Sequence, residues 1–188
     1  MGRWEPNASG RLARAALELY LERGFEQVTV AEIAKRAGLT ERTFFRHYAD
    51  KREVLFAGSG QLQELLVGAA DAAPGSAAPI DVVAAALLAV SAEFQERHEF
   101  ARQRQAVIAA NAELQERELS KLAALSAALT QALRRRGVAE PGASLAAETG
   151  VAVFKVAFER WISADDEQEF AHYIRESLGE LRVVAAGA

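Results

Sequence analysis

Apolar residues recur along this chain at intervals of three and four positions, the spacing of one face of an α-helix. The first amphipathic segment begins at Ser9, a good helix cap, and closes at Gly24. After Pro79 nothing suggests a strand. The sequence therefore predicts an all-α protein of about nine helices.

Two short helices joined by a tight turn are predicted between Thr29 and Tyr48. Thr29 and Glu32 have the spacing of a capping box, so a helix should begin there. Gly38 should end that helix, since glycine accepts the left-handed backbone that a sharp turn needs. Thr40 then caps a second helix that ends near Tyr48. This pattern is typical of a helix-turn-helix.

Further caps and breakers predict how the rest of the chain is organised. Asp50 and Glu53 form another capping box, and the helix that follows should continue to about Ala70. We expect a three-helix amino-terminal domain over residues 1–56 and a larger helical domain over residues 57–188. Asp165, with Gln168 three residues later, should cap the last helix. The later helices are expected at residues 80–98, 99–110, 113–136, 144–162 and 167–184.

Composition is ordinary for a folded protein, with 51% hydrophobic and 26% charged residues. The chain has no cysteine, which suits a reducing cytoplasm, and no apolar run approaches the roughly 18 residues of a membrane span. Residues 1–56 hold ten basic and eight acidic side chains, whereas the rest holds twelve and eighteen. The small basic excess therefore coincides with the helix-turn-helix.

Motifs of enzymes are scarce. Neither a phosphate-binding glycine loop nor a nucleophile elbow occurs, and His47, His98 and His172 are too far apart for a local metal-ligand spacing. Asp165 and Asp166 are adjacent at an expected helix start, where they are better explained as caps than as a catalytic pair. We expect no enzymatic activity, no cofactor and no metal, and a catalytic helical bundle is only a minor alternative.

The second helix of the turn motif carries groups suited to a DNA groove. Arg42 and Arg46 are four residues apart and share a face. Arginine can bond O6 and N7 of guanine together, so Arg42 is the first choice for a base reader. Thr43 can contact a thymine methyl group or a phosphate, while Phe44 and Tyr48 are expected in the core. The alternative for each cation is an ordinary solvated helix face.

The stretch FEQVTVAEIAKRAGLTERTFFRHYADKREVLF, residues 25–56, resembles the TetR family of bacterial transcriptional regulators. The resemblance implies a homodimer that binds a partly palindromic double-stranded DNA operator. Its two recognition helices would enter successive major grooves, about 34 Å or a multiple apart. It also implies repression, with a small molecule in the carboxy-terminal domain releasing the DNA.

The same resemblance assigns roles within the turn motif. Family members commonly contact the DNA backbone at the positions of Thr29, Thr40, His47 and Lys51, and such contacts set register rather than sequence. Phe45 stands where the family usually has a tyrosine whose hydroxyl contacts a phosphate. The candidate DNA-binding residues are Thr29, Thr40, Arg42, Thr43, Phe45, Arg46, His47 and Lys51.

The later stretches RQRQAVIAANAELQEREL (102–119) and FERWI (158–162) look similar to the branch with an acyl-CoA-like ligand domain. Phe154, Phe158 and Trp161 form a stripe at helical spacing that could line a cavity for a small hydrophobic or acyl-CoA-like effector, and ordinary core is the alternative. The candidate ligand-binding residues are Phe94, His98, Arg102, Val107, Leu122, Phe154, Phe158 and Trp161.

Several arginines have competing explanations. Arg102 and Arg104 could meet an anionic group of the ligand, or could pair with Glu96, Glu99 or Glu113 at the surface. Residues 134–136, three arginines at a helix end, suit the negative pole of the helix dipole, so we expect no DNA role for them.

Two further expectations concern association. The last two helices carry more apolar surface than one core face needs, and the family resemblance implies that they form a four-helix dimer interface. The alternative for the whole protein is a helical ligand-binding or scaffold protein that has lost specific DNA binding through Phe45.

Overall fold

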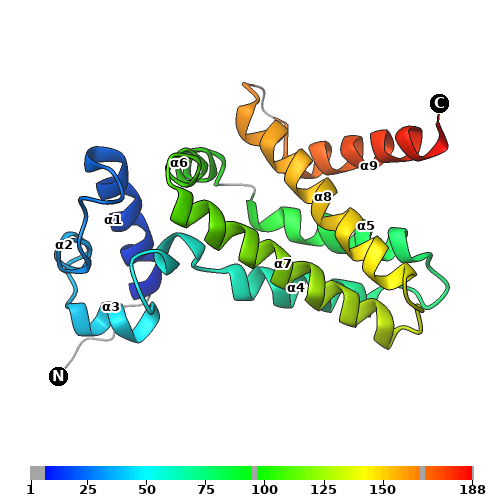
Figure 1. Ribbon diagram of the computed structural model, residues 1–188, viewed down its shortest axis with the longest axis horizontal. Coiled ribbons are helices and arrows are strands. Elements are labelled where there is room, and N and C mark those ends of the chain that lie inside the picture. Colours follow the sequence, from blue (N-terminus) through cyan, green and yellow to red (C-terminus); the bar gives the residue numbers. More distant parts are fainter. Residues whose placement is uncertain (1–6, 95–96, 166–167, 188) are drawn as a thin grey trace. The chain divides into compact units, whose positions relative to one another are not determined.

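The computed structural model describes residues 7–94, 97–165 and 168–187 (Figure 1). Within these ranges the chain forms nine α-helices and two short 3₁₀ helices, and no strand. The predicted all-α class and number of helices are therefore confirmed.

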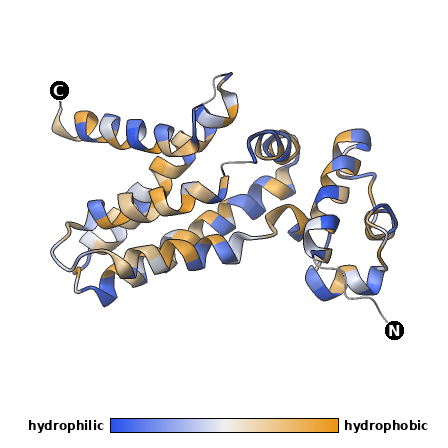
Figure 2. Cartoon of the chain, turned by 180° about the vertical axis from the view of Figure 1, so that it is seen from behind, coloured by the Kyte–Doolittle hydropathy of each residue, from blue (hydrophilic) through white to orange (hydrophobic). Residues whose placement is uncertain are grey.

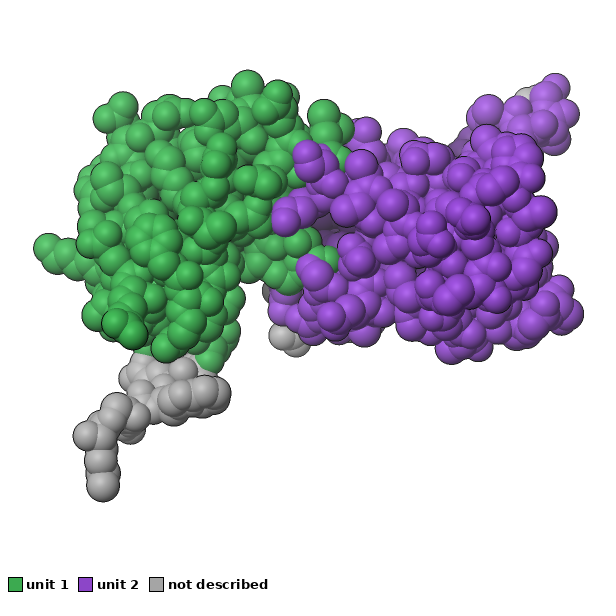
Figure 3. Space-filling model, turned by 60° about the horizontal axis from the view of Figure 1, so that its bottom comes forward, with its two compact units in different colours: residues 1–59, 103–119 green, residues 60–102, 120–188 purple. Residues whose placement is uncertain are grey.

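Contacts divide the chain into two compact units (Figure 3). The first contains the chain up to Ser59 together with Gln103–Leu119, and the second contains Gly60–Arg102 and the chain from Ser120 onward. The division of the chain at residue 56 stays a prediction, but the first unit includes a segment that a single cut there leaves out.

The first helix, α1, spans Ala8–Arg23 and begins before the residue predicted to cap it. Asn7 is the actual cap: its backbone is left-handed, with φ of 76°, and its side-chain oxygen accepts from the N–H of Gly10 at 3.0 Å. The prediction of Ser9 as the cap was wrong. Asparagine tolerates the left-handed region better than most residues, a signal that the sequence did carry. Gly24 closes the helix as expected.

The helix-turn-helix consists of α2 (Val30–Arg36) and α3 (Glu41–His47). Thr29 and Glu32 form the predicted capping box, because each side chain accepts from the backbone N–H of the other residue. Gly38 occupies the turn with φ of 66°, the left-handed conformation that the turn needs.

The single helix predicted from Asp50 to Ala70 is interrupted. The Asp50 carboxylate does accept from the backbone N–H groups of Arg52, at 2.8 Å, and Glu53, at 3.2 Å. Only a 3₁₀ helix, η1 (Glu53–Phe56), follows, and Gly58 then takes φ of 92°. That left-handed residue breaks the helical backbone, so α4 (Ser59–Ala72) begins afresh.

The core of the first unit includes side chains from a distant part of the sequence. Phe44 of α3 is fully buried there. So are Ile108 and Leu114, which come from α6 (His98–Ala109) and α7 (Ala112–Arg135). The three amino-terminal helices therefore share one hydrophobic core with the α6–α7 turn.

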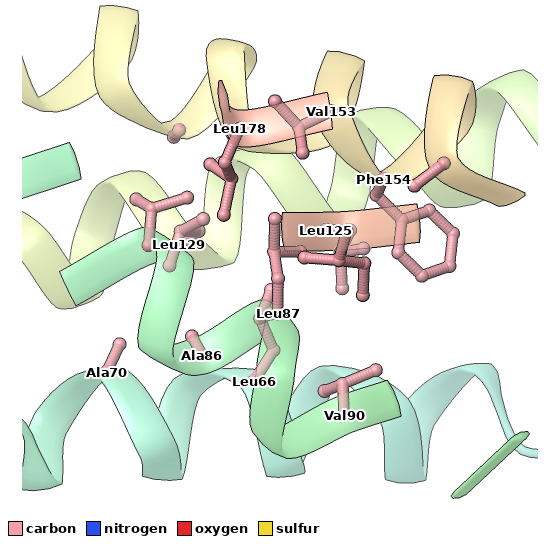
Figure 4. Close-up of a cluster of buried hydrophobic side chains, with 14 of the residues drawn as sticks. Leu66, Ala70, Ala86, Leu87, Val90, Leu125, Leu129, Val153, Phe154 and Leu178 are labelled. Carbon is pink, nitrogen blue, oxygen red and sulfur yellow. The ribbon is translucent and has the colours of Figure 1, made fainter. Parts of the chain in front are cut away.

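The second unit is a helical bundle built around α4, α5, α7, α8 and α9. Its core brings together Leu66 of α4, Leu87 of α5 and Leu129 of α7 (Figure 4). Figure 2 shows apolar and polar residues interspersed along these helices, as expected for elements that bury one face. The remaining elements are α5 (Pro79–Ser91), η2 (Ala92–Phe94), α8 (Gly142–Ser163) and α9 (Phe170–Ala186).

Helices α5 and α8 approach closely at Gly150, which is buried. A Cβ atom at this position would overlap Cγ1 of Val83. Glycine is thus required at Gly150 by the packing of α8 on α5.

Arg136 lies just beyond α7 and completes the end of α4. Its guanidinium donates to the backbone carbonyls of Asp71, Ala73 and Pro74, at 3.2, 2.9 and 2.6 Å. Arg135 pairs with the Asp71 carboxylate at 2.9 Å. These two arginines satisfy carbonyls and a carboxylate of another helix, beyond the helix-dipole role expected for them.

The last helix begins later than predicted. Glu169 is the residue before α9, and it makes no side-chain capping bond. The prediction of Asp165 as the cap was therefore wrong, and Asp166 and Glu167 lie outside the described residues. None of the described helices combines the length and the apolar character needed to cross a membrane.

Candidate functional site

Helix α3 separates its side chains into a buried face and an exposed face. Phe44 is 0% exposed and Tyr48, the next residue after the helix, is 7% exposed, so both lie in the core as predicted. Arg42, Phe45 and Arg46, spaced i, i+3 and i+4, share the exposed face. The helix therefore presents two arginines and one aromatic ring together.

Tyr48 fastens the end of α3 to the start of α1. Its hydroxyl donates to the backbone carbonyl of Ser9 at 3.0 Å and also contacts the Ser9 hydroxyl. Burial raises the pKa of Tyr48, so the hydroxyl keeps its proton for these bonds. The orientation of α3 is thus set by a ring in the core and a hydroxyl at its edge.

The two predicted cap threonines both have structural hydrogen bonds. Thr40 accepts from the N–H of Thr43 at 3.2 Å, and the two hydroxyls are 3.1 Å apart. Thr29 bonds Glu32 through both its N–H and its hydroxyl, at 2.9 and 2.8 Å. The side chain of Arg23, followed by these bonds from Thr29, lowers the pKa of Glu32 to about 2. Phosphate contacts by Thr29, Thr40 and the exposed His47 stay predictions.

Lys51 has a geometry that sequence reasoning did not foresee. Its ammonium donates to three backbone carbonyls of the α1–α2 connection, those of Phe25, Glu26 and Val28, at 2.9, 3.3 and 3.2 Å. An ammonium group has three N–H donors. All three are engaged within the chain, which is at odds with the phosphate contact that the family resemblance implied for Lys51.

Arg11 is a structural residue of the turn motif that the sequence analysis missed. Its guanidinium donates to the carbonyl of Ala37 at the end of α2, and its Nη2 atom is 2.9 Å from the position that a Cβ atom on Gly38 would take. Twenty-six positions separate Arg11 from Ala37. No local sequence signal connects residues so far apart.

Among the described residues, Arg42 and Arg46 form no salt bridge, unlike Arg23 of α1 and Arg36 of α2. Arg36 of α2 pairs with Glu22 at 2.8 Å and with Glu18 at 3.3 Å. Arg23 pairs with Glu32. Within the described part of the chain, the charges of Arg42 and Arg46 are therefore not compensated by an ion pair, whereas that of Arg36 is.

The predicted ligand residues of α8 lie in an aromatic cluster in the second unit. Phe154 and Phe158 stack with ring centroids 6.0 Å apart, and both lie edge-on to Phe94. Trp161 is 6.0 Å from Phe94. The structure thus brings together Phe94, Phe154, Phe158 and Trp161 as closely packed rings.

His98 and Phe170 complete this cluster. The Nε2 atom of His98 lies 2.9 Å from the carbonyl of Trp161, and the two rings meet edge to face at 4.8 Å. Phe170, the first residue of α9, lies 5.1 Å from Phe94. Sequence reasoning missed Phe170 because it belongs to a different helix from the α8 stripe and joins the cluster only through tertiary packing. Leu122 packs against the same core.

Two other predicted ligand residues lie elsewhere. Val107 is buried in the core of the first unit and not among the aromatic rings, because the part of α6 that carries it packs with the amino-terminal helices. Arg102 is exposed and pairs with Glu99 at 2.7 Å, which is the surface-pairing alternative. Glu96 lies outside the described residues.

Arg104, the second arginine considered for an anionic ligand, instead bonds groups within the first unit. Its Nε donates to the carbonyl of Leu55 at 2.7 Å, and its guanidinium lies 4.9 Å from the Phe56 ring centroid. Glu118 lies 3.2 Å from it. Arg104 therefore fastens α6 to η1, and its side chain is only 19% exposed.

Comparison with known proteins shows the family. The model of the bacterial regulatory proteins of the tetR family matches residues 12–57, and that of the MftR C-terminal domain matches residues 77–186. Together they cover the helix-turn-helix and most of the second unit. The chain belongs to the TetR family of bacterial regulatory proteins.

Individual relatives agree with this assignment. The chain is 38% identical over 80 residues to the HTH-type transcriptional regulator TcmR of Streptomyces glaucescens, a match covering 43% of this chain and 35% of TcmR. It is 27% identical over 191 residues to the putative mycofactocin biosynthesis transcriptional regulator MftR of Mycobacterium tuberculosis, covering 100% of this chain and 94% of that protein. These relatives are transcriptional regulators, and the chain is a DNA-binding regulator of this family and not an enzyme.

Solved structures share the fold at low identity. FadR of Thermus thermophilus, in complex with lauroyl-CoA, superposes with a TM-score of 0.57 at 22% identity, covering 93% of each chain. FadR of Bacillus subtilis, in complex with stearoyl-CoA, gives a TM-score of 0.61 at 20% identity, covering 92% of this chain and 96% of that one. Because the superpositions cover more than nine-tenths of this chain, the shared fold includes both units.

Proposed function

We propose that this regulator binds a partly palindromic operator as a homodimer, represses transcription there, and is released by a hydrophobic, acyl-CoA-like effector. The observation that carries the DNA-binding part is the exposed face of α3, where Arg42 and Arg46 are side by side without an intramolecular ion pair in the described chain. The cytoplasm, where bacterial DNA lies, is the expected location.

Readout of the operator is assigned to three side chains of α3. Arg42 and Arg46 project from one face and can each form a pair of bonds to a guanine edge. Thr43 is half-buried beside them and close to Thr40. Thr40 caps α3, His47 ends it and Thr29 caps α2. All three are proposed to contact phosphates, which set the register of the helix on the DNA.

Pairing of two copies is assigned to α8 and α9. Several large apolar side chains of these helices remain exposed in the single chain, namely Leu145, Val156, Val183 and Val184, at 63, 49, 47 and 76%. Burying such a surface against its own copy would form a two-fold symmetric four-helix interface. The dimer would then place two α3 helices about 34 Å, or a multiple of it, apart along the DNA.

The effector is assigned to the second unit, next to the aromatic cluster of Phe94, Phe154, Phe158 and Trp161. This cluster is the largest gathering of aromatic rings in the described part of that unit, and apolar and aromatic side chains usually predominate in small-molecule sites. Two structural neighbours of the whole fold, the FadR proteins of Thermus thermophilus and Bacillus subtilis, were solved with acyl-CoA thioesters. An acyl chain is the part of such a ligand that the rings would contact.

Selection of oligonucleotides from a random pool by the purified full-length protein tests the DNA-binding proposal. We expect enrichment of an inverted repeat whose half-sites are one or two helical turns apart. Lack of any enriched site would instead favour a helical ligand-binding or scaffold protein without specific DNA binding. Mass spectrometry of small molecules released from the protein tests the effector, and a long-chain acyl thioester is the expected finding. A polar ligand would contradict it.

A further inference from the structure

Phe45 is a large apolar side chain on the exposed face of α3. It is 56% exposed, although the ring next to it in sequence, Phe44, is fully buried. The two rings meet edge to face, with centroids 5.5 Å apart at 80°. Phe45 is thus held at the border of the core while most of its ring faces outward.

The position of Phe45 around the helix is informative. Successive residues of an α-helix are turned by about 100°, so Arg42 and Arg46 lie at the centre of the exposed arc. Phe45 lies on one side of this centre and His47 on the other. A groove that encloses both arginines can therefore also reach the Phe45 ring.

The charge around Phe45 limits what can cover it. The helix positions around it are Glu41, Arg42 and Arg46, which together carry a net positive charge. A surface that covers Phe45 and also meets both arginines is therefore anionic, and it must offer an apolar group at the right place. The DNA major groove meets both requirements, because its walls are phosphates and each thymine presents a C5-methyl group on its floor. That methyl is the apolar group among the base edges in this groove.

We propose that Phe45 reads a thymine methyl group in each half-site, as a determinant of sequence specificity beside the arginines. The inference rests on the proposed function, since it requires α3 to enter the major groove. The family resemblance suggested a different role for this position, a tyrosine hydroxyl that contacts a phosphate. Phenylalanine has no hydroxyl and cannot make that contact. A methyl buried against the ring contributes about a fourfold change in affinity per half-site, or about sixteenfold for two.

The first test uses the wild-type protein on its selected operator, with each thymine replaced in turn by deoxyuridine. This replacement removes the C5-methyl and leaves base pairing unchanged. We expect one thymine per half-site at which the replacement lowers affinity by about fourfold. If no position responds, Phe45 does not read a methyl group and the inference is overturned.

Variants of Phe45 connect the effect to this ring. With Phe45→Ala, the response to deoxyuridine should disappear at that position, and repeated selection should no longer prefer thymine there. With Phe45→Tyr, the ring is kept, so the response should persist. Thermal unfolding should be nearly unchanged in both, because the side chain is largely exposed. A Phe45→Ala protein that retains the full response would contradict the assignment.

His47→Ala is a matched control on the opposite side of the same helix face. It should lower affinity without changing the base preference or the deoxyuridine response. Failure of the inference is also distinguishable from failure of the proposed function. If the wild type enriches no site at all, both fail, whereas an enriched site without methyl dependence overturns only the role of Phe45.

Discussion

The ammonium group of Lys51 lies 4.4 Å from the ring centroid of Phe25 and 2.9 Å from the carbonyl oxygen of the same residue. A cation over an aromatic face is attracted by the ring, and here the same cation also satisfies backbone carbonyls of the α1–α2 connection. Tyr20 donates to the Lys51 carbonyl at 2.7 Å, so side chain and backbone of Lys51 are both engaged. This residue links the end of the turn motif to the connection before it.

Replacing Lys51 by alanine should therefore destabilise the protein by about 1–3 kcal/mol, because three carbonyls lose their donor. The salt dependence of DNA binding should remain unchanged. Lys35→Ala, which removes an exposed lysine of α2, is the stability control and should have little effect. Thermal unfolding and DNA titrations at several salt concentrations provide the two readouts. A slope flatter by about one unit in the Lys51 variant would instead support a phosphate contact.

Arg42→Ala should relax the base preference at one position of each half-site, at a cost of about 1–3 kcal/mol in discrimination. The reason is that Arg42 lies at the centre of the exposed face of α3 and has no ion pair within the described chain. Repeating the oligonucleotide selection with the variant measures this directly. Arg134→Ala, at an exposed position of α7, is the matched control and should select the wild-type site. An unaltered selected site with Arg42→Ala would show that another residue is the reader.

Gly150→Ala should destabilise the second unit by about 1–3 kcal/mol, because the added methyl overlaps Val83 between α8 and α5. The expected fall in melting temperature is about 2–4 °C per kcal/mol for a protein of this size. Gly68→Ala on α4 is the control, since nothing lies within 4 Å of its Cβ position. It should be neutral or stabilising, as alanine is favoured over glycine within helices. Adding Val83→Ala should restore part of the stability lost by Gly150→Ala, and a failure to do so would contradict the proposed overlap.

Stability should also respond to the ionisation of Glu32. Its pKa falls from 4.5 in the reference state to about 2 in the folded chain, chiefly through Arg23 and Thr29. A lowered folded-state pKa means that the stabilisation is fully present above about pH 4.5 and is lost as the pH falls toward 2. The difference in melting temperature between the wild type and Glu32→Gln should thus be largest near neutral pH and shrink below about pH 4.5. Glu26→Gln, an exposed change in the α1–α2 connection, is the control, and a difference independent of pH would contradict the assignment.

Local signals explain why much of the fold could be predicted. The caps at Thr29 and Thr40 and the turn at Gly38 each depend on residues within four positions of one another. Residues so close in sequence are also close in the folded chain, so a short motif is enough to predict them. The α3 face follows from the same periodicity. Where local signals were misread, as at Asn7 and Gly58, the cause was a left-handed backbone that was not anticipated.

Long-range contacts explain what could not be predicted. Arg11 and Ala37, or Lys51 and Phe25, meet only because the helices fold against one another. The same holds for Val107, whose apolar character indicated a core position but not which of the two cores it enters. A periodic pattern shows that a residue is buried, and tertiary structure decides what it is buried against.

The discontinuity of the first unit limits how such proteins can be recombined. A fragment ending at Ser59 carries α3 and its reading face but leaves behind Ile108 and Leu114, which fill the same core. Grafted onto another regulator, it would need an α6–α7 turn that presents apolar side chains of matching volume. Exchange of DNA specificity between relatives is therefore constrained by a turn that belongs, in sequence, to the other half of the chain, and the two halves are expected to diversify together at this point.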